Sequence, residues 1–309
     1  MSRPVEWPTI LLLVATYVIW LSGTLIWADS ALLSLLLTTY AIAQFSSLQH
    51  EVLHGHPFAN QRLNEALVFP GLTLTVPYVR FRDTHLAHHY DPNLTDPYDD
   101  PESNYQDPAV WERLSRPMHK LLRWNNTLLG RLVLGPVLGN VSFIAKDAAA
   151  IRAGDRRIAL AWGLHGLGVA LVLAWLWGAT EMPLLAYVLA AYLGQSVLKI
   201  RTFLEHRAHE AFRARTVIIE DRGPLALLFL NNNLHVVHHM HPAVPWYDLP
   251  RLYAERKAHY QRRNDGYVYG NYVEIFRRYF TRAKDPVPHP VWPVRKTETP
   301  DMTPEGPQN

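Results

Sequence analysis

Four apolar runs, each long enough to form a membrane-spanning helix, constrain this chain more than any other feature. The hydrocarbon core of a bilayer is crossed by about 20 apolar residues in helical conformation. The runs cover residues 9–28, 31–47, 158–179 and 184–200, and only short polar breaks separate the first from the second and the third from the fourth. We therefore predict an all-α integral membrane protein with four transmembrane helices in two hairpins. The polar stretches outside the hairpins are expected to form a helical cap.

Two further apolar stretches contain residues that oppose a spanning helix. Residues 63–78 include Pro70 and Gly71, so we predict a helix that lies against the bilayer without crossing it. Residues 127–144 include the charged Arg131, which favours an interfacial helix.

The two ends of the sequence differ in character. The first apolar run is too long for the apolar region of a cleavable signal peptide, so we expect it to be a transmembrane helix. From residue 285 the chain is polar and rich in proline, which is typical of a disordered tail. The expected organisation is one membrane domain, residues 1–284, followed by a tail, residues 285–309.

Basic residues are distributed unevenly around the apolar runs. The turns near residues 29 and 181 carry none, whereas the other ends are flanked by Arg3, Arg80, Arg82, Lys146, Arg152, Arg156, Arg157, Lys199 and Arg201. Because cytoplasmic loops are enriched in Lys and Arg, we predict that both termini and the cap lie on the cytoplasmic side, in a bacterial inner membrane. The net charge of +3 is too small to argue for a nucleic-acid partner.

Histidine is the residue type that carries the chemical signal. The chain has no cysteine, which excludes disulfides and metal sites built on its own thiolates, and it has 16 histidines. Spacings of three and four place side chains on one face of a helix, so a cluster with these spacings can direct several imidazoles at one point. Four clusters have them: His50 and His54; His85, His88 and His89; His206 and His209; His235, His238 and His239.

The number of clustered histidines argues for two metal ions. Neutral imidazole is a ligand suited to iron, copper, nickel and zinc. Eight or nine imidazoles exceed the six positions of one octahedral ion, so a pair of ions is the simpler interpretation. Coordination rich in histidine, without cysteine and next to a lipid phase, favours iron used for O2 chemistry, although the residues alone leave the metal open.

These motifs resemble the membrane fatty acid desaturase superfamily. Its three histidine boxes correspond to H-E-V-L-H from His50, H-L-A-H-H from His85 and H-V-V-H-H from His235, in the same order relative to the apolar runs. The resemblance implies that the eight box histidines bind two irons. It also implies a ninth ligand in an E-H context, where His206 fits and His209 is the competitor. Some relatives have Asn at the position of Thr202.

The resemblance also implies a reaction and its partners. It predicts O2-dependent desaturation of a fatty acyl chain that is linked to a lipid or a thioester, with two irons as cofactor and no catalytic side chain beyond the ligands. A separate electron donor, such as a ferredoxin or a cytochrome b5-like protein, would dock on the cap. A lipid or carotenoid hydroxylase or ketolase of the same superfamily is the alternative.

Other classes of protein account for fewer of the motifs. The segment H-E-V-L-H also fits the zinc protease motif, with Glu51 as general base. A ferritin-like carboxylate site needs two Glu-x-x-His motifs, and only Glu51-x-x-His54 is convincing. A non-catalytic metal-binding or transport protein is the third class.

Several other residues are candidates for supporting roles. We expect His56 to be structural or to support the ligands, His241 to shape a turn, and His165 to pack between helices or to form a hydrogen bond between them. Trp246 and Tyr247 fit either a substrate channel or the membrane interface. The acidic residues that could orient imidazoles are Asp83, Asp91, Asp96, Glu205 and Asp221.

Depth along the last helix favours His206 over His209 as the ninth ligand. If the helix continues past Ile200 with a rise of 1.5 Å per residue, His206 lies about 9 Å and His209 about 13–14 Å beyond it. By the same rise His50 and His54 lie about 4–5 and 10–11 Å beyond the second run, which is the depth of His206.

Overall fold

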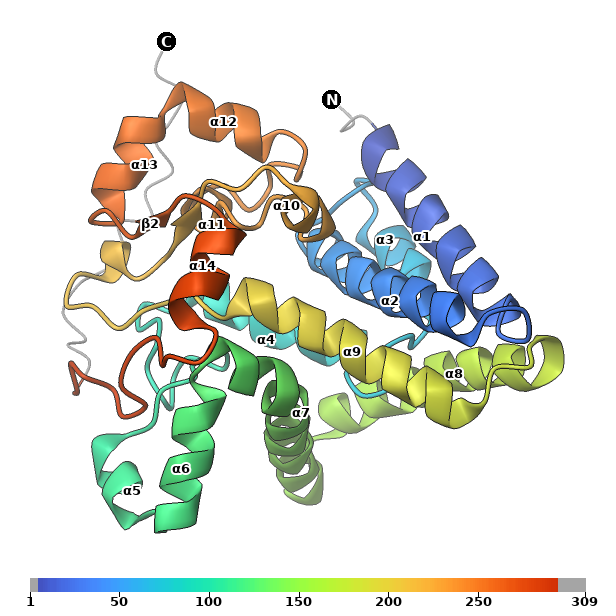
Figure 1. The fold of residues 1–309 in the computed structure, drawn as a ribbon, viewed down its shortest axis with the longest axis horizontal. Coiled ribbons are helices and arrows are strands. Elements are labelled where there is room, and N and C mark those ends of the chain that lie inside the picture. Colours follow the sequence, from blue (N-terminus) through green and yellow to red (C-terminus); the bar gives the residue numbers. More distant parts are fainter. Residues whose placement is uncertain (1–4, 294–309) are drawn as a thin grey trace.

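The computed structural model describes residues 5–293, and its fold is built on two antiparallel helical hairpins (Figure 1). The first consists of α1 (Trp7–Leu25) and α2 (Ala31–Leu53), and the second of α8 (Arg156–Ala179) and α9 (Leu184–Thr202). Because α1 packs against α2 and α2 against α9, the hairpins form one bundle. Three of the predicted runs lie within α2, α8 and α9, and the first, residues 9–28, ends three residues beyond α1. This agreement confirms a mainly helical fold.

Capping residues determine where the helices of the bundle begin. Ser30 Oγ accepts the N–H of Leu33 at the start of α2, and Asp155 accepts the N–H groups of Arg157 and Ile158 at the start of α8. Such caps satisfy N–H groups that the first helical turn leaves without partners. The α1–α2 and α8–α9 turns lie at the same end of the bundle (Figure 1).

The bundle is tied together by buried aromatic side chains. Trp20 Nε1 donates to the hydroxyl of Tyr187 at 3.1 Å, and that hydroxyl donates to the carbonyl of Leu72 at 3.0 Å. Trp20 and Tyr187 belong to the same core cluster as Phe45. The hydrogen bonds fix α1 relative to α9 and to the loop before α4, while Phe45 adds α2 to the same core. The ends of α2 and α9 lead into the candidate site.

A fifth long helix, α7 (Leu128–Arg152), extends beyond the interfacial helix that we predicted for residues 127–144. The helix continues through Pro136 and ends at Arg152. It is long and apolar enough to cross a membrane, so the described residues contain five helices of this kind where the sequence predicted four. It packs against α9, α6 (Arg116–Asn125) and α8.

The prediction of a helix over residues 63–78 is wrong. The short helix α3 (Gln61–Leu67) ends before Pro70 and Gly71, and the chain then forms a buried loop that leads to α4 (Tyr78–Tyr90). Proline cannot donate the backbone hydrogen bond that a helix interior requires. The loop is held instead by hydrogen bonds that its carbonyl groups accept from Tyr187 and His165.

The rest of the described chain forms a cap of short helices at the end of the bundle opposite the two turns (Figure 1). A two-residue parallel pairing joins Ile218 to Val268 inside it. The remaining elements are α5 (Pro108–Arg113), η1 (Phe212–Ala214), β1 (Ile218–Ile219), α10 (Pro224–Leu228), α11 (His235–Met240), α12 (Leu249–Glu255), α13 (Lys257–Arg263), β2 (Val268–Tyr269) and α14 (Tyr272–Tyr279).

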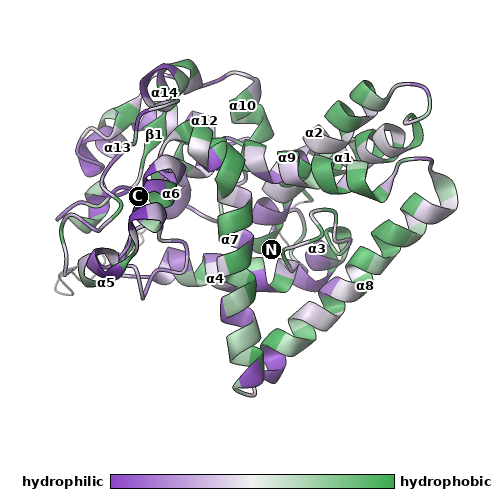
Figure 2. Ribbon diagram, turned by 60° about the horizontal axis from the view of Figure 1, so that its bottom comes forward, coloured by the Kyte–Doolittle hydropathy of each residue, from purple (hydrophilic) through white to green (hydrophobic). Residues whose placement is uncertain are grey.

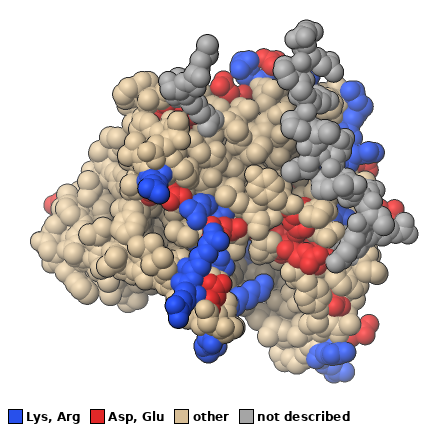
Figure 3. Space-filling model, turned by 180° about the vertical axis from the view of Figure 1, so that it is seen from behind, with Lys and Arg blue, Asp and Glu red and all other residues tan. Residues whose placement is uncertain are grey.

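Polarity divides the molecule into an apolar bundle and a polar cap. Hydrophilic residues gather in the cap and at the junction of α7 and α8, whereas α1, α2, α8 and α9 are mainly hydrophobic (Figure 2). Leu32, Leu171 and Leu185 are among the large apolar side chains that the bundle exposes. Seen from behind, the bundle side has almost no charged side chains, while Lys, Arg, Asp and Glu gather nearer the cap (Figure 3). This surface is the one expected of helices surrounded by lipid.

The proline-rich segment from residue 285 begins as ordered chain, where we expected disorder. Val287 and His289 are buried, and Gln106 exchanges backbone hydrogen bonds with Val287 and His289. The expected tail from residue 294 onward lies outside the described residues.

Candidate metal centre

The histidine clusters converge where the bundle meets the cap. His50 lies in the last turn of α2, and His54 ends that helix. The second box lies on α4 and the third on α11, while His206 lies just after α9. The structure brings the nine predicted histidines into two groups: His50, His54, His85, His89 and His238 in one, and His88, His206, His235 and His239 in the other. Within each group the candidate ligand nitrogens lie within 4.8 Å of one another.

Each H-x-x-H-H box contributes to both groups. On α4, His85 and His89 belong to the first group and His88 to the second. On α11, His238 belongs to the first group, and His235 and His239 belong to the second. A helix turns about 100° per residue. Relative to position i, position i+4 is therefore rotated by about 40° in one direction and position i+3 by about 60° in the other. The doubled histidine therefore lets one short helix serve two neighbouring sites.

Distances between the imidazole nitrogens fit shared metal ions. The Nε2 atoms of His88 and His206 are 2.9 Å apart, and those of His85 and His89 are 3.0 Å apart. Nitrogens at right angles on one ion, with bonds of about 2.1 Å as in zinc sites, would be about 3.0 Å apart. The groups are therefore compact enough to bind an ion each without rearrangement.

Hydrogen bonds behind the rings direct lone pairs into the site. Nδ1 of His85 contacts Glu102 at 2.8 Å, and Nδ1 of His88 contacts Asp100 at 2.7 Å. A carboxylate only accepts, so Nδ1 carries a proton, and Nε2 can offer a lone pair to a metal whenever the ring is neutral. Lone pairs that converge at about 3 Å repel one another unless a cation lies between them. The residues thus fit the metal that the motifs predict.

His235 has the same arrangement with a neutral partner. Its Nδ1 contacts Oδ1 of Asn232 at 3.0 Å, and the Asn232 amide donates to Glu205. Glu205 Oε1 lies 4.0 Å from that Nδ1. Partners of this kind fix the tautomer and orientation of a metal-binding imidazole.

Two histidines of the first group have ring nitrogens that lack a protein partner. Nε2 of His50 and Nε2 of His54 are buried and accept no hydrogen bond within the described part of the chain. A buried polar atom without a partner is costly, and metal coordination is one way to satisfy it.

Burial keeps most of these imidazoles in the form that binds metal. Burial, reinforced by neighbouring imidazoles, lowers the pKa of His89, His235, His238 and His239 well below the usual value. His88 differs: burial would lower its pKa, but Glu102 and Asp100 outweigh that effect and raise the pKa to about 9. A metal at His88 would have to displace a proton, as is general for metal binding by protonated ligands.

The sequence identified only one of the acidic residues that lie behind the imidazoles. Glu205 is near His235, whereas Asp83 forms ion pairs with Arg82 and Arg157. The others, Asp91, Asp96 and Asp221, accept backbone N–H groups in turns.

Asp100, Glu102 and Asn232 are the partners that sequence reasoning missed. The first two belong to an acidic stretch that follows the second box, and Asn232 lies three residues before the third box. Proximity to the boxes was the only available signal, and it did not distinguish them from the other polar residues nearby.

The structure places His206 with the other histidines and His209 apart from them. His209 is partly exposed and lies 3.5 Å from Asp265. The premise of a continuous helix is wrong, because α9 ends at Thr202 and His206 pairs with Thr216 in an isolated bridge. The position of His206 therefore follows from a turn of the chain, and its role as a ligand stays a prediction.

The isolated histidines have ordinary partners. His165 Nε2 donates to the carbonyl of Leu74 at 3.1 Å, so it joins α8 to the loop before α4 and not to a second helix. His241 Nε2 forms a hydrogen bond with the hydroxyl of Tyr260, with 3.1 Å between the two atoms.

Glu51 does not occupy the place of a protease base. Its carboxylate accepts the backbone N–H of Trp246 at 2.9 Å and groups with Glu6 and His56, separately from the nine histidines. A general base must reach the water that the metal activates. His50 and His54 also share their group with three more imidazoles, which a zinc protease site does not have.

Comparison with known proteins agrees with the geometry. The fatty acid desaturase family model matches residues 7–271, which include all nine histidines. The chain belongs to this family. A comparison with curated proteins found no match.

Proposed function

We propose that this protein desaturates a fatty acyl chain with O2, using two irons held by the nine histidines. The observation that carries the proposal is the pair of compact histidine groups, with Nε2 atoms directed inward, at the end of an apolar helix bundle. When bound, the irons would supply oxidation of unactivated C–H bonds by O2. The protein contributes the nitrogens that hold them and the carboxylates that orient those nitrogens.

The reaction requires an electron donor. Removing two hydrogens from adjacent carbons while O2 becomes two waters consumes two further electrons and two protons. The chain contains no cysteine for an iron–sulfur cluster of its own. We therefore propose a separate donor, such as a ferredoxin or a cytochrome b5-like protein, that docks on the cap.

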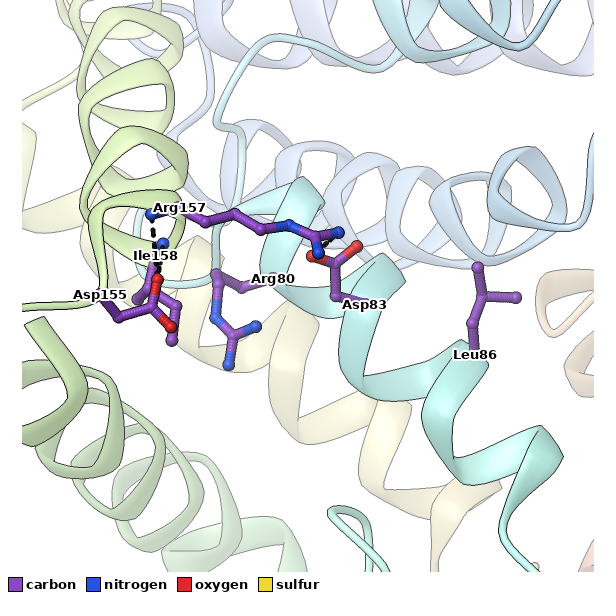
Figure 4. Close-up of a pocket in the computed structure, with 6 residues that line it drawn as sticks. All are labelled: Arg80, Asp83, Leu86, Asp155, Arg157 and Ile158. Atoms are coloured by element: carbon purple, nitrogen blue, oxygen red, sulfur yellow. Dashed lines mark hydrogen bonds and ion pairs between the residues drawn. The ribbon is translucent and has the colours of Figure 1, made fainter.

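We also propose that only four helices cross the membrane. Arg157 at the start of α8 pairs with Asp83 of α4 at 3.2 Å, and Arg80 of α4 pairs with Asp147 near the end of α7 at 2.9 Å. Figure 4 shows Arg157 reaching across a surface pocket to Asp83. Because α4 also carries the second histidine box, the junction of α7 and α8 lies on the cap side. Both ends of α7 then face the cytoplasm, which fits a helix lying along the surface.

The nature of the product tests the proposal. Membranes of cells that express the gene would be analysed by lipid mass spectrometry, beside cells that express His238→Ala. We expect a lipid that lacks two hydrogens only with the unaltered chain. A lipid with one additional oxygen would instead establish a hydroxylase, the alternative within the superfamily, and the desaturase proposal would fail.

A further inference from the structure

One face of α2 carries a row of exposed side chains that ends at a buried glutamine. Leu33, Leu36 and Tyr40 are exposed and follow one another at spacings of three and four, so they lie on the same face of the helix. Gln44 is the next position on this face, yet its exposed fraction is 0%. Its Nε2 donates to the carbonyl of Leu228 at 3.3 Å, and Leu228 is the last residue of α10, which lies beside α2 (Figure 1). The short helix α10 therefore covers the row at Gln44.

Gln44 lies at a level of α2 that we expect to be inside the hydrocarbon core. It precedes residue 47, where the apolar run ends. With a rise of 1.5 Å per residue, it also lies about 13–14 Å before the end of α2 at Leu53. Acyl chains are expected to cover Leu36 and Tyr40 on the same face. At Gln44, α10 takes the place that lipid has beside these two residues.

The composition and hydrogen bonds of α10 suit this place. Residues 224–230 are all apolar, and the exposed fraction of Leu227 is 51%. The carbonyl of Leu228 belongs to the last turn of a helix, where intrahelical partners are lacking, and in lipid an unpaired carbonyl is costly. The Gln44 amide supplies the missing donor, while its Oε1 accepts from the hydroxyl of Tyr40 at 3.3 Å. Gln44 thus satisfies a backbone group at a depth where water is scarce.

The helix α14 lies next to α10 and has the composition of an interfacial helix. Its Tyr272 packs edge to face against Phe229, directly after α10, with ring centroids 5.6 Å apart. Val273, Arg277 and Phe280 are exposed and lie on one face, at spacings of four and three. Apolar side chains together with a basic one are typical of a helix at the level of the lipid headgroups. The apolar surface of α2 and α10 therefore continues onto α14.

We propose that α10 is embedded among the acyl chains of the leaflet on the cap side, fastened to α2 by Gln44, with α14 beside it at the headgroups. Lipid is the occupant of this surface because the surface continues the exposed row of α2 and shares its depth. The proposal goes beyond the proposed reaction, since it concerns how the cap is held. Seven residues separate Leu228 from His235 of the third box. The bilayer would thus help to hold the segment that carries this box.

Spin labelling tests the position of α10. The chain contains no cysteine, so one introduced cysteine can carry one nitroxide. Leu227→Cys, Leu36→Cys and Ala254→Cys would be labelled and reconstituted in bilayers of phosphatidylcholine and phosphatidylglycerol; Ala254 is exposed on α12, in the cap. Power saturation then compares collisions of the label with O2, which concentrates in hydrocarbon, and with a water-soluble nickel chelate. We expect O2 to dominate at residues 227 and 36 and the chelate to dominate at residue 254.

A label at residue 227 that collides with the chelate at least as often as with O2 would place α10 in water, open to a soluble protein, and would overturn the proposal. The measurement requires neither iron nor turnover. Its outcome is therefore independent of whether the chain is a desaturase.

The same label reports whether Gln44 fastens α10. Gln44→Leu leaves the carbonyl of Leu228 without its donor, so the nitroxide spectrum at residue 227 should narrow as α10 becomes more mobile. Ser46→Ala is the control, because the hydroxyl of Ser46 donates to the carbonyl of Ile42 within α2 itself. Identical spectra in both variants would overturn the role of Gln44.

Discussion

Neighbouring groups distinguish His206 from His209, which are three residues apart in sequence. His206 Nε2 lies within 3.2 Å of Nε2 atoms of both His88 and His235, whereas His209 lies beside the exposed Asp265. Loss of a residue that merely supports a metal ligand typically costs about 10–100-fold in metal affinity or activity. We expect His206→Ala to lose at least that much, together with bound iron, and His209→Ala to retain most of both.

The measurement is the iron content of both purified variants beside their lipid product. Full iron and turnover in His206→Ala, with loss of both in His209→Ala, would move the ninth ligand to His209.

The partner of His88 provides a second test at this scale. Asp100 holds Nδ1 of His88 at 2.7 Å and is almost fully buried. Asn at this position is a weaker acceptor and can turn its amide toward the ring, so we expect Asp100→Asn to lower iron affinity by roughly 10–100-fold. Asp99→Asn, at the exposed neighbouring position, is the control. Iron titration of both variants would measure the effect, and unchanged affinity in Asp100→Asn would show that this contact does not support the site.

The sequence predicted which histidines come together but not how they divide. Spacing on one helix shows which side chains share a face, and that identified the boxes. The division of His85 from His88 depends on how α4, α11 and α2 lie relative to one another, which is tertiary information. Asp100 and Glu102 lie in an irregular segment after α4, where no periodicity indicates direction.

At the scale of elements, close helix contacts depend on particular glycines. A Cβ at Gly168 of α8 would lie 2.6 Å from the carbonyl oxygen of Phe69 and 3.1 Å from the backbone nitrogen of Gly71. These are backbone atoms of the buried loop before α4, so they cannot move aside as a side chain would. At Gly166, by contrast, a Cβ would meet nothing within 4 Å.

We therefore expect Gly168→Val to destabilise the protein by about 1–3 kcal/mol, the usual cost of overpacking. Gly166→Val is the matched control and should change stability little. Thermal unfolding in detergent would compare the two variants. Equal unfolding temperatures would contradict the predicted contact between α8 and the loop.

Hydropathy predicted the long helices well and the irregular elements poorly. Runs of about 20 apolar residues have few alternatives to a helix in lipid. Residues 63–78 are also apolar, but they form a loop because Pro70 and Gly71 prevent a helix and the bundle satisfies the loop's carbonyls. The length of α7 was underestimated because the apolar run ends at residue 144, shortly before Lys146 and Asp147, whereas the helix continues to Arg152.

For the whole molecule, the distribution of basic residues predicts which side of the membrane each part of the chain faces. The two hairpin turns carry no Lys or Arg, and the basic residues lie toward the cap. We expect reporter fusions near residues 29 and 181 to report the far side of the membrane and a fusion after residue 283 to report the cytoplasm. A reporter after residue 283 on the far side would separate the histidines from a cytoplasmic electron donor and contradict the proposal.

The proposed function depends most directly on the identity and number of the ions that the nine histidines hold. Elemental analysis of the purified chain, with His238→Ala and His239→Ala as one variant from each group, tests it in one measurement. We predict two irons per unaltered chain and a loss of iron in both variants. A single zinc per chain, or iron that neither substitution removes, would contradict the assignment of a two-iron centre.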